Sequence, residues 1–193
     1  MKNRIAIALA ALALTACAVG NRSTVETAAY DLGPAASSGS PSFSNPGVAL
    51  DVRLPAWLDG LTMSYRLAYA DPQRVYGYTQ ARWAGAPARM AQQRLWQLLG
   101  TASGSVPCTL HIELGEFVQV FDAPDRSRAV VSGDATLQGR GRMIIAHLPF
   151  RAEVAAGTDA RSGAAALAAA TAAVAATLGP WLEGRRTACP PPV

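Results

Sequence analysis

The sequence predicts an α+β fold in which an antiparallel β-sheet packs against two main α-helices. Several stretches alternate apolar and polar residues, which is typical of strands with one buried face. Two other stretches, residues 87–100 and 160–178, repeat apolar residues at helical spacing. The order of strands, one helix, three long strands and a final helix favours consecutive hairpins with both helices packed on the sheet.

The first half of the chain is expected to supply short strands separated by turns. An alternating pattern at residues 48–52 predicts a strand that Pro55 stops, because proline cannot donate to a β-ladder. The Asp71-Pro72 pair is a turn signal. The other strand candidates in this half are residues 29–32, 63–69 and 74–80.

The second half is expected to hold longer strands. Residues 108–114 alternate regularly, and Gly115 is placed for a β-bulge before the strand continues through residues 117–121. A hairpin loop at residues 122–125 follows. Residues 129–140 and 143–154 complete the meander.

Two helices complete the expected fold. Pro87 suits the first turn of a helix that ends at Gly100. The second helix is rich in alanine and too weakly apolar to favour a membrane-spanning role. We expect it to pack on the sheet through a stripe formed by Leu167, Thr171, Val174 and Leu178.

The N-terminus has the layout of a secretory signal peptide. Lys2 and Arg4 precede an apolar run of about ten residues, roughly half of what a transmembrane helix needs. The run leads into the lipobox Leu14-Thr15-Ala16-Cys17. In bacterial lipoproteins the cysteine thiol at this position receives diacylglycerol before cleavage. The alternative is an ordinary signal peptide that contains a cysteine.

These features predict the organisation of the whole chain. The signal peptide, residues 1–16, is removed, and Cys17 carries covalent diacylglycerol and palmitate. In many lipoproteins an aspartate directly after the lipid-bearing cysteine retains the protein in the inner membrane. Here that position is Ala18, so we expect an outer-membrane protein that faces the periplasm. The remaining parts are a lipidated N-terminus with a short strand and a flexible Ser/Gly/Pro loop (17–46), one globular α+β domain (47–184) and a C-terminal tail (185–193).

Composition and charge indicate a globular protein without a nucleic-acid partner. Half of the residues are hydrophobic and 16% are charged. The formal net charge of +4 includes Lys2 and Arg4, so it falls to +2 when the signal peptide is removed. That charge is too small, and the basic residues too dispersed, to favour nucleic acid.

Cys108 and Cys189 are the cysteines that remain after Cys17. An even pair of cysteines in the oxidising periplasm is a disulfide candidate. Such a bridge would tie a central strand to the C-terminal tail. The alternative is two free thiols.

The sequence offers little catalytic chemistry. Its two histidines, His111 and His147, do not belong to a cluster of cysteine, histidine and aspartate with metal-ligand spacing. A serine-hydrolase elbow and a phosphate-binding P-loop are both missing from the sequence. We therefore expect no catalytic residue, no metal site and no cofactor beyond the lipid on Cys17.

Aromatic residues gather between residues 57 and 83. Aromatic side chains are enriched in interface hot spots, so Trp57, Tyr76 and Trp83 are candidates for a partner surface. Packing in the core explains the same cluster, and the sequence leaves both interpretations open.

A series of landmarks resembles the ABC-type transport auxiliary lipoproteins, the PqiC-like family. After the lipobox come a short strand, an extended run that ends in proline, an aromatic-Leu-Asp turn, and an Arg-Trp-Ala landmark before the first long helix. The resemblance covers most of residues 28–182. In this sequence the landmarks are Cys17, Tyr30-x-Leu32, the run from Val48 to Pro55, Trp57-Leu58-Asp59, Met63-Ser-Tyr-Arg66, Tyr78, Arg82-Trp83-Ala84 and Pro87.

The resemblance implies a non-catalytic outer-membrane component of an ABC/MCE-type intermembrane lipid transport system that helps maintain outer-membrane integrity. The implied partners are a mammalian-cell-entry (MCE) type periplasmic lipid-binding protein and, through it, an inner-membrane ABC permease and ATPase. A ring-shaped homo-oligomer would suit a tubular bridge. The alternative is a stand-alone structural or assembly lipoprotein of the cell envelope, and an enzyme is a more distant one.

Overall fold

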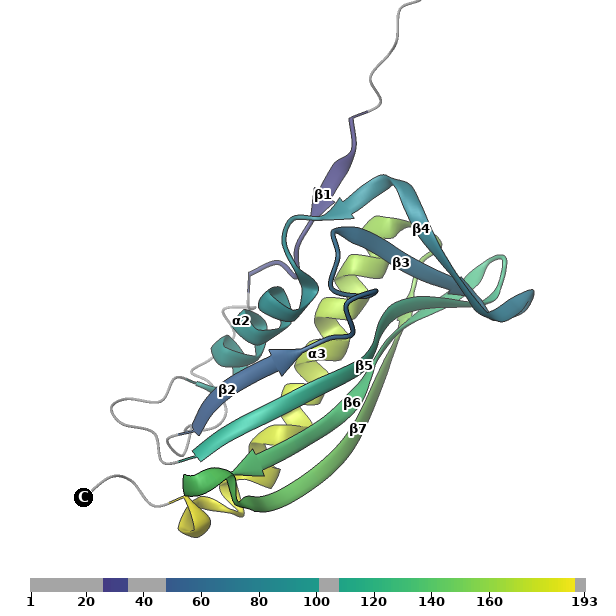
Figure 1. Cartoon of the computed structure of the whole chain (residues 1–193). Helices are drawn as coiled ribbons and strands as arrows, with labels where there is room; N and C mark the ends of the chain where they lie inside the picture. Colours follow the sequence, from purple (N-terminus) through teal and green to yellow (C-terminus); the bar gives the residue numbers. More distant parts are fainter. Residues whose placement is uncertain (1–25, 35–47, 101–107, 190–193) are drawn as a thin grey trace, which may run out of the picture.

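One seven-stranded β-sheet and two α-helices make up the part of the chain that the computed structural model describes, residues 26–34, 48–100 and 108–189 (Figure 1). The predicted α+β class and the two main helices are confirmed. The strands are β1 (Ala28–Tyr30), β2 (Val48–Arg53), β3 (Thr62–Leu67), β4 (Asp71–Trp83), β5 (Cys108–Ala123), β6 (Arg126–Gln138) and β7 (Ile144–Ala156). The helices are α2 (Pro87–Leu99) and α3 (Ala160–Glu183), with short 3-10 turns η1 (Arg140–Arg142) and η2 (Arg186–Ala188).

The sheet is mixed, which corrects the expectation of a purely antiparallel one. Its strand order is β1-β4-β3-β5-β6-β7, and β2 also pairs with β5. The pairs β1–β4, β2–β5 and β3–β5 are parallel, while β3–β4, β5–β6 and β6–β7 are antiparallel. Between β2 and β5 the chain passes through β3, β4 and α2, a connection long enough to return it in its original direction. An alternating pattern carries no information on strand direction.

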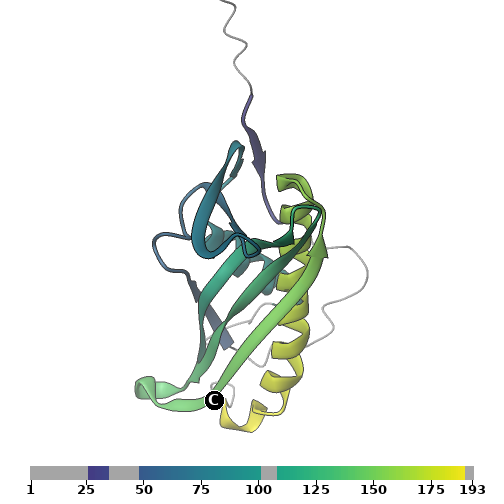
Figure 2. The same cartoon turned by 90° about the vertical axis from the view of Figure 1, so that its right-hand side faces the viewer.

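Both helices cover the same face of the sheet (Figures 1 and 2). Helix α3 packs on β6 and β7, and α2 packs on β2 and against α3. The predicted stripe of α3 is buried, and the capping box formed by Asp159 and Ser162 fixes where this helix begins. The Ser162 backbone N–H donates to the Asp159 carboxylate at 2.7 Å, and this bond holds the pKa of Asp159 below its ordinary value.

Among the described residues, α3 is the one helix whose length and composition would let it cross a membrane. In the fold it is a core helix. Twelve of its residues are buried, and they include Leu167, Val174, Leu178 and Leu182. The expectation that this alanine-rich helix packs on the sheet is therefore confirmed.

The predicted bulge at Gly115 is present in β5. The register of β5 against β6 shifts between Leu114 and Glu116, and Gly133 of β6 lies opposite Leu114. A Cβ atom on Gly133 would overlap the carbonyl oxygen of Glu113. The close approach of the two backbones at the bulge therefore requires glycine at this position.

We expect Gly133→Ala to lower the free energy of unfolding by roughly 3 kcal/mol, because the added methyl group meets backbone atoms that cannot move aside. Urea denaturation followed by circular dichroism measures the change. Gly60→Ala is the matched control, since nothing lies within 4 Å of a Cβ atom there. An unchanged midpoint for Gly133→Ala would show that the strands can separate at the bulge without cost.

A disulfide joins the start of β5 to the C-terminal end of the described chain. The sulfur atoms of Cys108 and Cys189 lie 2.07 Å apart, and their Cα atoms are 5.8 Å apart. Cys189 directly follows η2 and is only 2% exposed. The end of the chain is thus packed against the sheet at least as far as Cys189.

Candidate functional site

The helices leave one face of the sheet uncovered, and we call it the open face (Figure 2). Side chains alternate between the two faces of a strand. On β5 the buried residues Leu110, Ile112 and Leu114 point to the helices, so Thr109, His111 and Glu113 point to the open face. The open face is therefore polar over β2, the first half of β5 and the part of β6 paired with it, whereas Val118, Val120 and Val130 form a small buried apolar cluster further along.

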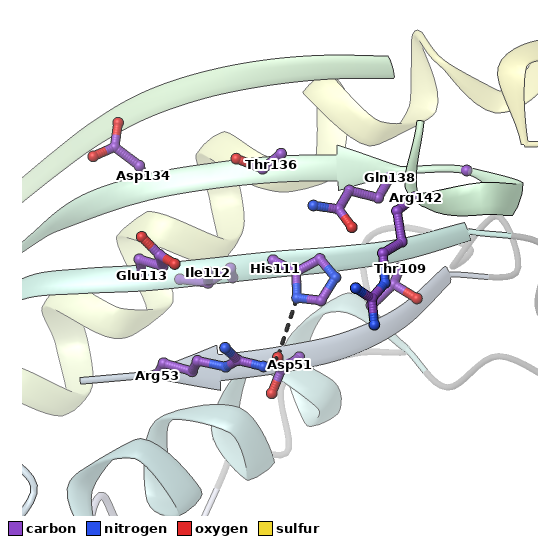
Figure 3. Close-up of a pocket in the computed structure, with 11 residues that line it drawn as sticks. Asp51, Arg53, Thr109, His111, Ile112, Glu113, Asp134, Thr136, Gln138 and Arg142 are labelled. Atoms are coloured by element: carbon purple, nitrogen blue, oxygen red, sulfur yellow. Dashed lines mark hydrogen bonds and ion pairs between the residues drawn. The ribbon is translucent and has the colours of Figure 1, made fainter. Parts of the chain in front are cut away.

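A hollow of about 550 Å³ lies on the open face, where β2, β5, β6 and η1 come together (Figure 3). We call it the polar hollow, because charged and neutral hydrogen-bonding side chains line it. They are Asp51 and Arg53 of β2, Thr109, His111 and Glu113 of β5, Asp134, Thr136 and Gln138 of β6, and Arg142 of η1.

Pairs of charged groups cross the strands of the hollow. His111 Nδ1 lies 3.1 Å from Asp51 Oδ2, and the same carboxylate oxygen is 2.9 Å from the Arg53 guanidinium. A second pair, at 2.9 Å, joins His147 of β7 to Asp134. In the part of the chain that the structure describes, no three such ligands gather as a metal site would require.

A ladder of charges continues along the open face above the hollow. Arg128 contacts both Asp122 and Glu153, and Arg151 contacts both Glu153 and Glu116. Burial raises the pKa of the Glu116 carboxyl, but hydrogen bonds from Ser132 and Arg151 outweigh it and hold this pKa below its ordinary value. The lowered pKa means that these hydrogen bonds stabilise the ionised carboxylate of Glu116 in the folded state. Their contribution to the stability of the fold is therefore present at neutral pH and is lost as the pH falls into the acidic range.

The predicted partner residue Trp57 is exposed. It follows β2, and 53% of its surface is accessible. The Arg66 guanidinium lies 5.6 Å from the centre of its ring. Val75 stands opposite Arg66 in the β3–β4 pair and is 39% exposed. Trp57, Arg66 and Val75 form what we call the Trp57 patch.

Trp83, a candidate for the partner surface, is buried, so of the two interpretations left open by the sequence, core packing applies to it. It is 2% exposed and lies in the core, with its ring 5.7 Å from that of Phe117. Its position at the end of β4, where β1 pairs alongside, places the indole on the helix-covered face. An aromatic residue in a strand can point to either face of the sheet, and the residues next to Trp83 in the sequence do not indicate which face it occupies.

Tyr76 belongs to a different face from Trp57. It stands opposite Tyr65, and their rings stack at 5.3 Å, whereas Trp57 contacts the neighbouring residue Arg66. Because adjacent strand residues point to opposite faces, the two predicted partner residues do not form one surface. Within the wider aromatic cluster, Trp83 belongs to the core and Tyr78 packs against it, whereas Trp57 and Tyr69 are exposed.

The tyrosine cluster ends in a buried polar network. The Tyr78 hydroxyl donates to Gln119 Oε1 at 2.9 Å, and Gln119 Nε2 donates to Ser127 and to the Gly157 carbonyl, both at 2.8 Å. Burial, with the nearby Tyr65 and Asp159, raises the pKa of Tyr78 to about 12. The phenol is therefore a permanent hydrogen-bond donor that stabilises this junction.

Other predicted residues lie outside the described part of the chain. They are Cys17, the lipobox residues Leu14, Thr15 and Ala16, and the Ser/Gly/Pro loop between β1 and β2. The polar hollow was missed because Asp51 and His111 are 60 residues apart in the sequence. The polar positions in the alternating patterns of β2 and β5 indicate a polar face on each strand. The patterns do not reveal that the two strands pair and bring these positions together.

Comparison with known proteins identifies one matching family and several solved structures with a similar fold. The family model described as ABC-type transport auxiliary lipoprotein component matches residues 30–179. A crystal structure of a Xanthomonas campestris protein is similar with a TM-score of 0.65 and 20% identity, and the match covers 77% of this chain and 92% of that one. Another crystal structure, of an uncharacterized protein, has a TM-score of 0.62 and 18% identity over 81% and 99% of the two chains. No curated protein matches significantly.

Proposed function

Because the chain belongs to the ABC-type transport auxiliary lipoprotein family, we propose that it is the outer-membrane lipoprotein of an ABC/MCE-type intermembrane lipid transport system. In this proposal it docks the periplasmic MCE-type bridge at the outer membrane and helps maintain outer-membrane integrity. The observation that carries the proposal is the family match over residues 30–179, which covers β2 to β7, helix α2 and most of α3.

The lipobox supports the anchoring part of the proposal. Acyl chains on Cys17 would hold the domain at the membrane, since each buried methylene contributes about 0.8 kcal/mol of membrane affinity. The ten residues between Cys17 and Ala28, where β1 begins, span at most roughly 40 Å when fully extended. The domain would therefore stay close to the membrane surface, within reach of a bridge that ends there.

A docking protein needs a surface with binding energy, and the Trp57 patch supports that part. Tryptophan and arginine are the residues most enriched in interface hot spots. Trp57 presents an accessible indole, Arg66 lies against its ring, and Val75 extends the apolar area. We propose that this patch contacts the bridge protein and that the chain itself catalyses no reaction.

The test is to mix the purified lipoprotein in detergent with an MCE-type bridge protein of the same organism and to measure the dissociation constant. We expect a complex that Trp57→Ala weakens by about 30-fold, which corresponds to roughly 2 kcal/mol for a hot-spot residue. Trp96→Ala is the matched control, because Trp96 of α2 is 43% exposed but lies on another element.

Two outcomes would contradict the proposal. If Trp57→Ala and Trp96→Ala bind equally well, the Trp57 patch is not the docking surface. If the folded wild-type proteins form no complex at concentrations on the order of tens of micromolar, the stand-alone structural role is favoured instead.

A further inference from the structure

The Arg142 end of the polar hollow has an unusual backbone. Gly141 and Arg142 are both in the left-handed region, with φ of 69° and 63°, and Arg142 is the one non-glycine residue with positive φ among those described. Non-glycine residues rarely adopt this conformation, and it concentrates at functional sites. The Gly139 N–H donates to the Met143 carbonyl at 2.9 Å and closes the turn. The turn directs the Arg142 side chain back over the sheet toward Thr109 (Figure 3).

His111 and Arg142 both line this end of the hollow (Figure 3). His111 Nδ1 contacts the Asp51 carboxylate at 3.1 Å, so this nitrogen carries a proton and Nε2 is left for another partner. Within the described residues, Arg53 has an ion-pair partner in Asp51, whereas Arg142 has none.

We propose that this end of the hollow is a binding site for a phosphate-type oxyanion. The Arg142 guanidinium donates two hydrogen bonds in the fork geometry that suits phosphate. The Thr109 hydroxyl supplies a neutral donor, and His111, whose Nδ1 faces Asp51, would donate from Nε2 in its imidazolium form. The hollow of about 550 Å³ has the size of a small-molecule site.

The carboxylates of the hollow do not oppose an anion at this end. Asp51 is paired with the Arg53 guanidinium at 2.9 Å, and the Asp134 carboxylate lies 2.9 Å from His147 Nε2. Glu113 lies at the far end of the hollow from Arg142 (Figure 3). The charged groups that line the hollow around His111 are Asp51 and Arg53 of β2, Glu113 of β5, Asp134 of β6 and Arg142 of η1.

A phospholipid headgroup and free inorganic phosphate share this chemistry, and the site does not depend on the bridge protein. The experiment titrates the full-length protein, in a detergent that carries no phosphate, with inorganic phosphate and separately with soluble dihexanoyl phosphatidylglycerol. Isothermal titration calorimetry gives the dissociation constants. We expect Arg142→Gln to weaken binding at least tenfold and Arg140→Gln, an exposed arginine of the same turn that does not line the hollow, to leave it unchanged.

A second arm tests the role of His111 with the same two probes. We expect His111→Gln to weaken binding, because the imidazole lines the hollow and its Nδ1 is held by Asp51. Equal affinity of wild type and His111→Gln would exclude His111 from the site.

The outcomes separate the sources of the anion. Binding of phosphatidylglycerol alone, or of both probes, assigns the site to a lipid headgroup, and binding of phosphate alone assigns it to the free anion. Lack of binding of either probe at millimolar concentration, or equal binding by wild type and Arg142→Gln, overturns the proposal. None of these results bears on whether the bridge protein docks, so this site and the proposed function can fail independently.

Discussion

Replacing Cys17 by serine is expected to abolish lipid attachment, because serine has no thiol to accept diacylglycerol. The acyl chains would supply most of the membrane affinity, at about 0.8 kcal/mol for each buried methylene. Within the described residues, the one helix apolar enough to span a membrane, α3, is packed in the core and does not replace them. Radiolabelled palmitate should enter the wild type alone, and the variant should be unprocessed or soluble in envelope fractions.

The control for this experiment is Ala18→Ser, which alters the neighbouring residue and keeps the thiol of Cys17. It should be labelled and sedimented with membranes like the wild type. If Cys17→Ser takes up palmitate to the same extent, lipid attachment at Cys17 is disproved. If wild type and variant are both cleaved and released without label, the N-terminus is an ordinary signal peptide.

The elements of the fold could be predicted because their patterns are local. Alternation located β2 and β5 to within one or two residues, and helical spacing located α2 and the buried stripe of α3. Their assembly could not be predicted in the same way. The parallel pairing of β2 with β5 is set by how the intervening chain returns through α2, and a strand pattern does not encode its partner or direction.

The candidate site was less predictable than the fold for the same reason. The sequence does not distinguish Trp57 from Trp83. In the structure Trp57 follows β2 and is exposed, whereas Trp83 points into the core. The Asp51–His111 contact depends on the β2–β5 register, in which these two residues stand directly opposite each other. A single arginine such as Arg142 becomes notable only when its left-handed backbone and its neighbours are known.

The disulfide has the second large expected effect. Cys108 and Cys189 are separated by 81 residues, and the loop that they close contains β5, β6, β7 and α3. In the chain-entropy model a loop of this length stabilises the folded state by roughly 4–5 kcal/mol at most, because it restricts the unfolded chain. Cys189→Ser is therefore expected to lower the free energy of unfolding by up to that amount.

The loss of stability should start at one place. Cys108 is the first residue of β5 and stands opposite Val48 of β2, so the bridge fastens the end of the chain where this parallel pair begins. Without it, the short turn η2 would depend on local hydrogen bonds such as the one from the Ala188 N–H to the Arg185 carbonyl. We expect hydrogen exchange to rise first in η2 and in the last turn of α3, ahead of the β5–β6 core.

The measurement compares urea denaturation of wild type and Cys189→Ser with and without reductant. Reductant should lower the midpoint of the wild type to that of the variant and leave the variant unchanged, because the variant has no Cys108–Cys189 bond to reduce. On a non-reducing gel, wild type should migrate faster than Cys189→Ser, since a closed loop makes the denatured chain more compact. A wild-type midpoint that is insensitive to reductant, together with two reactive thiols in the periplasmic protein, would show that the cysteines are unpaired in the cell.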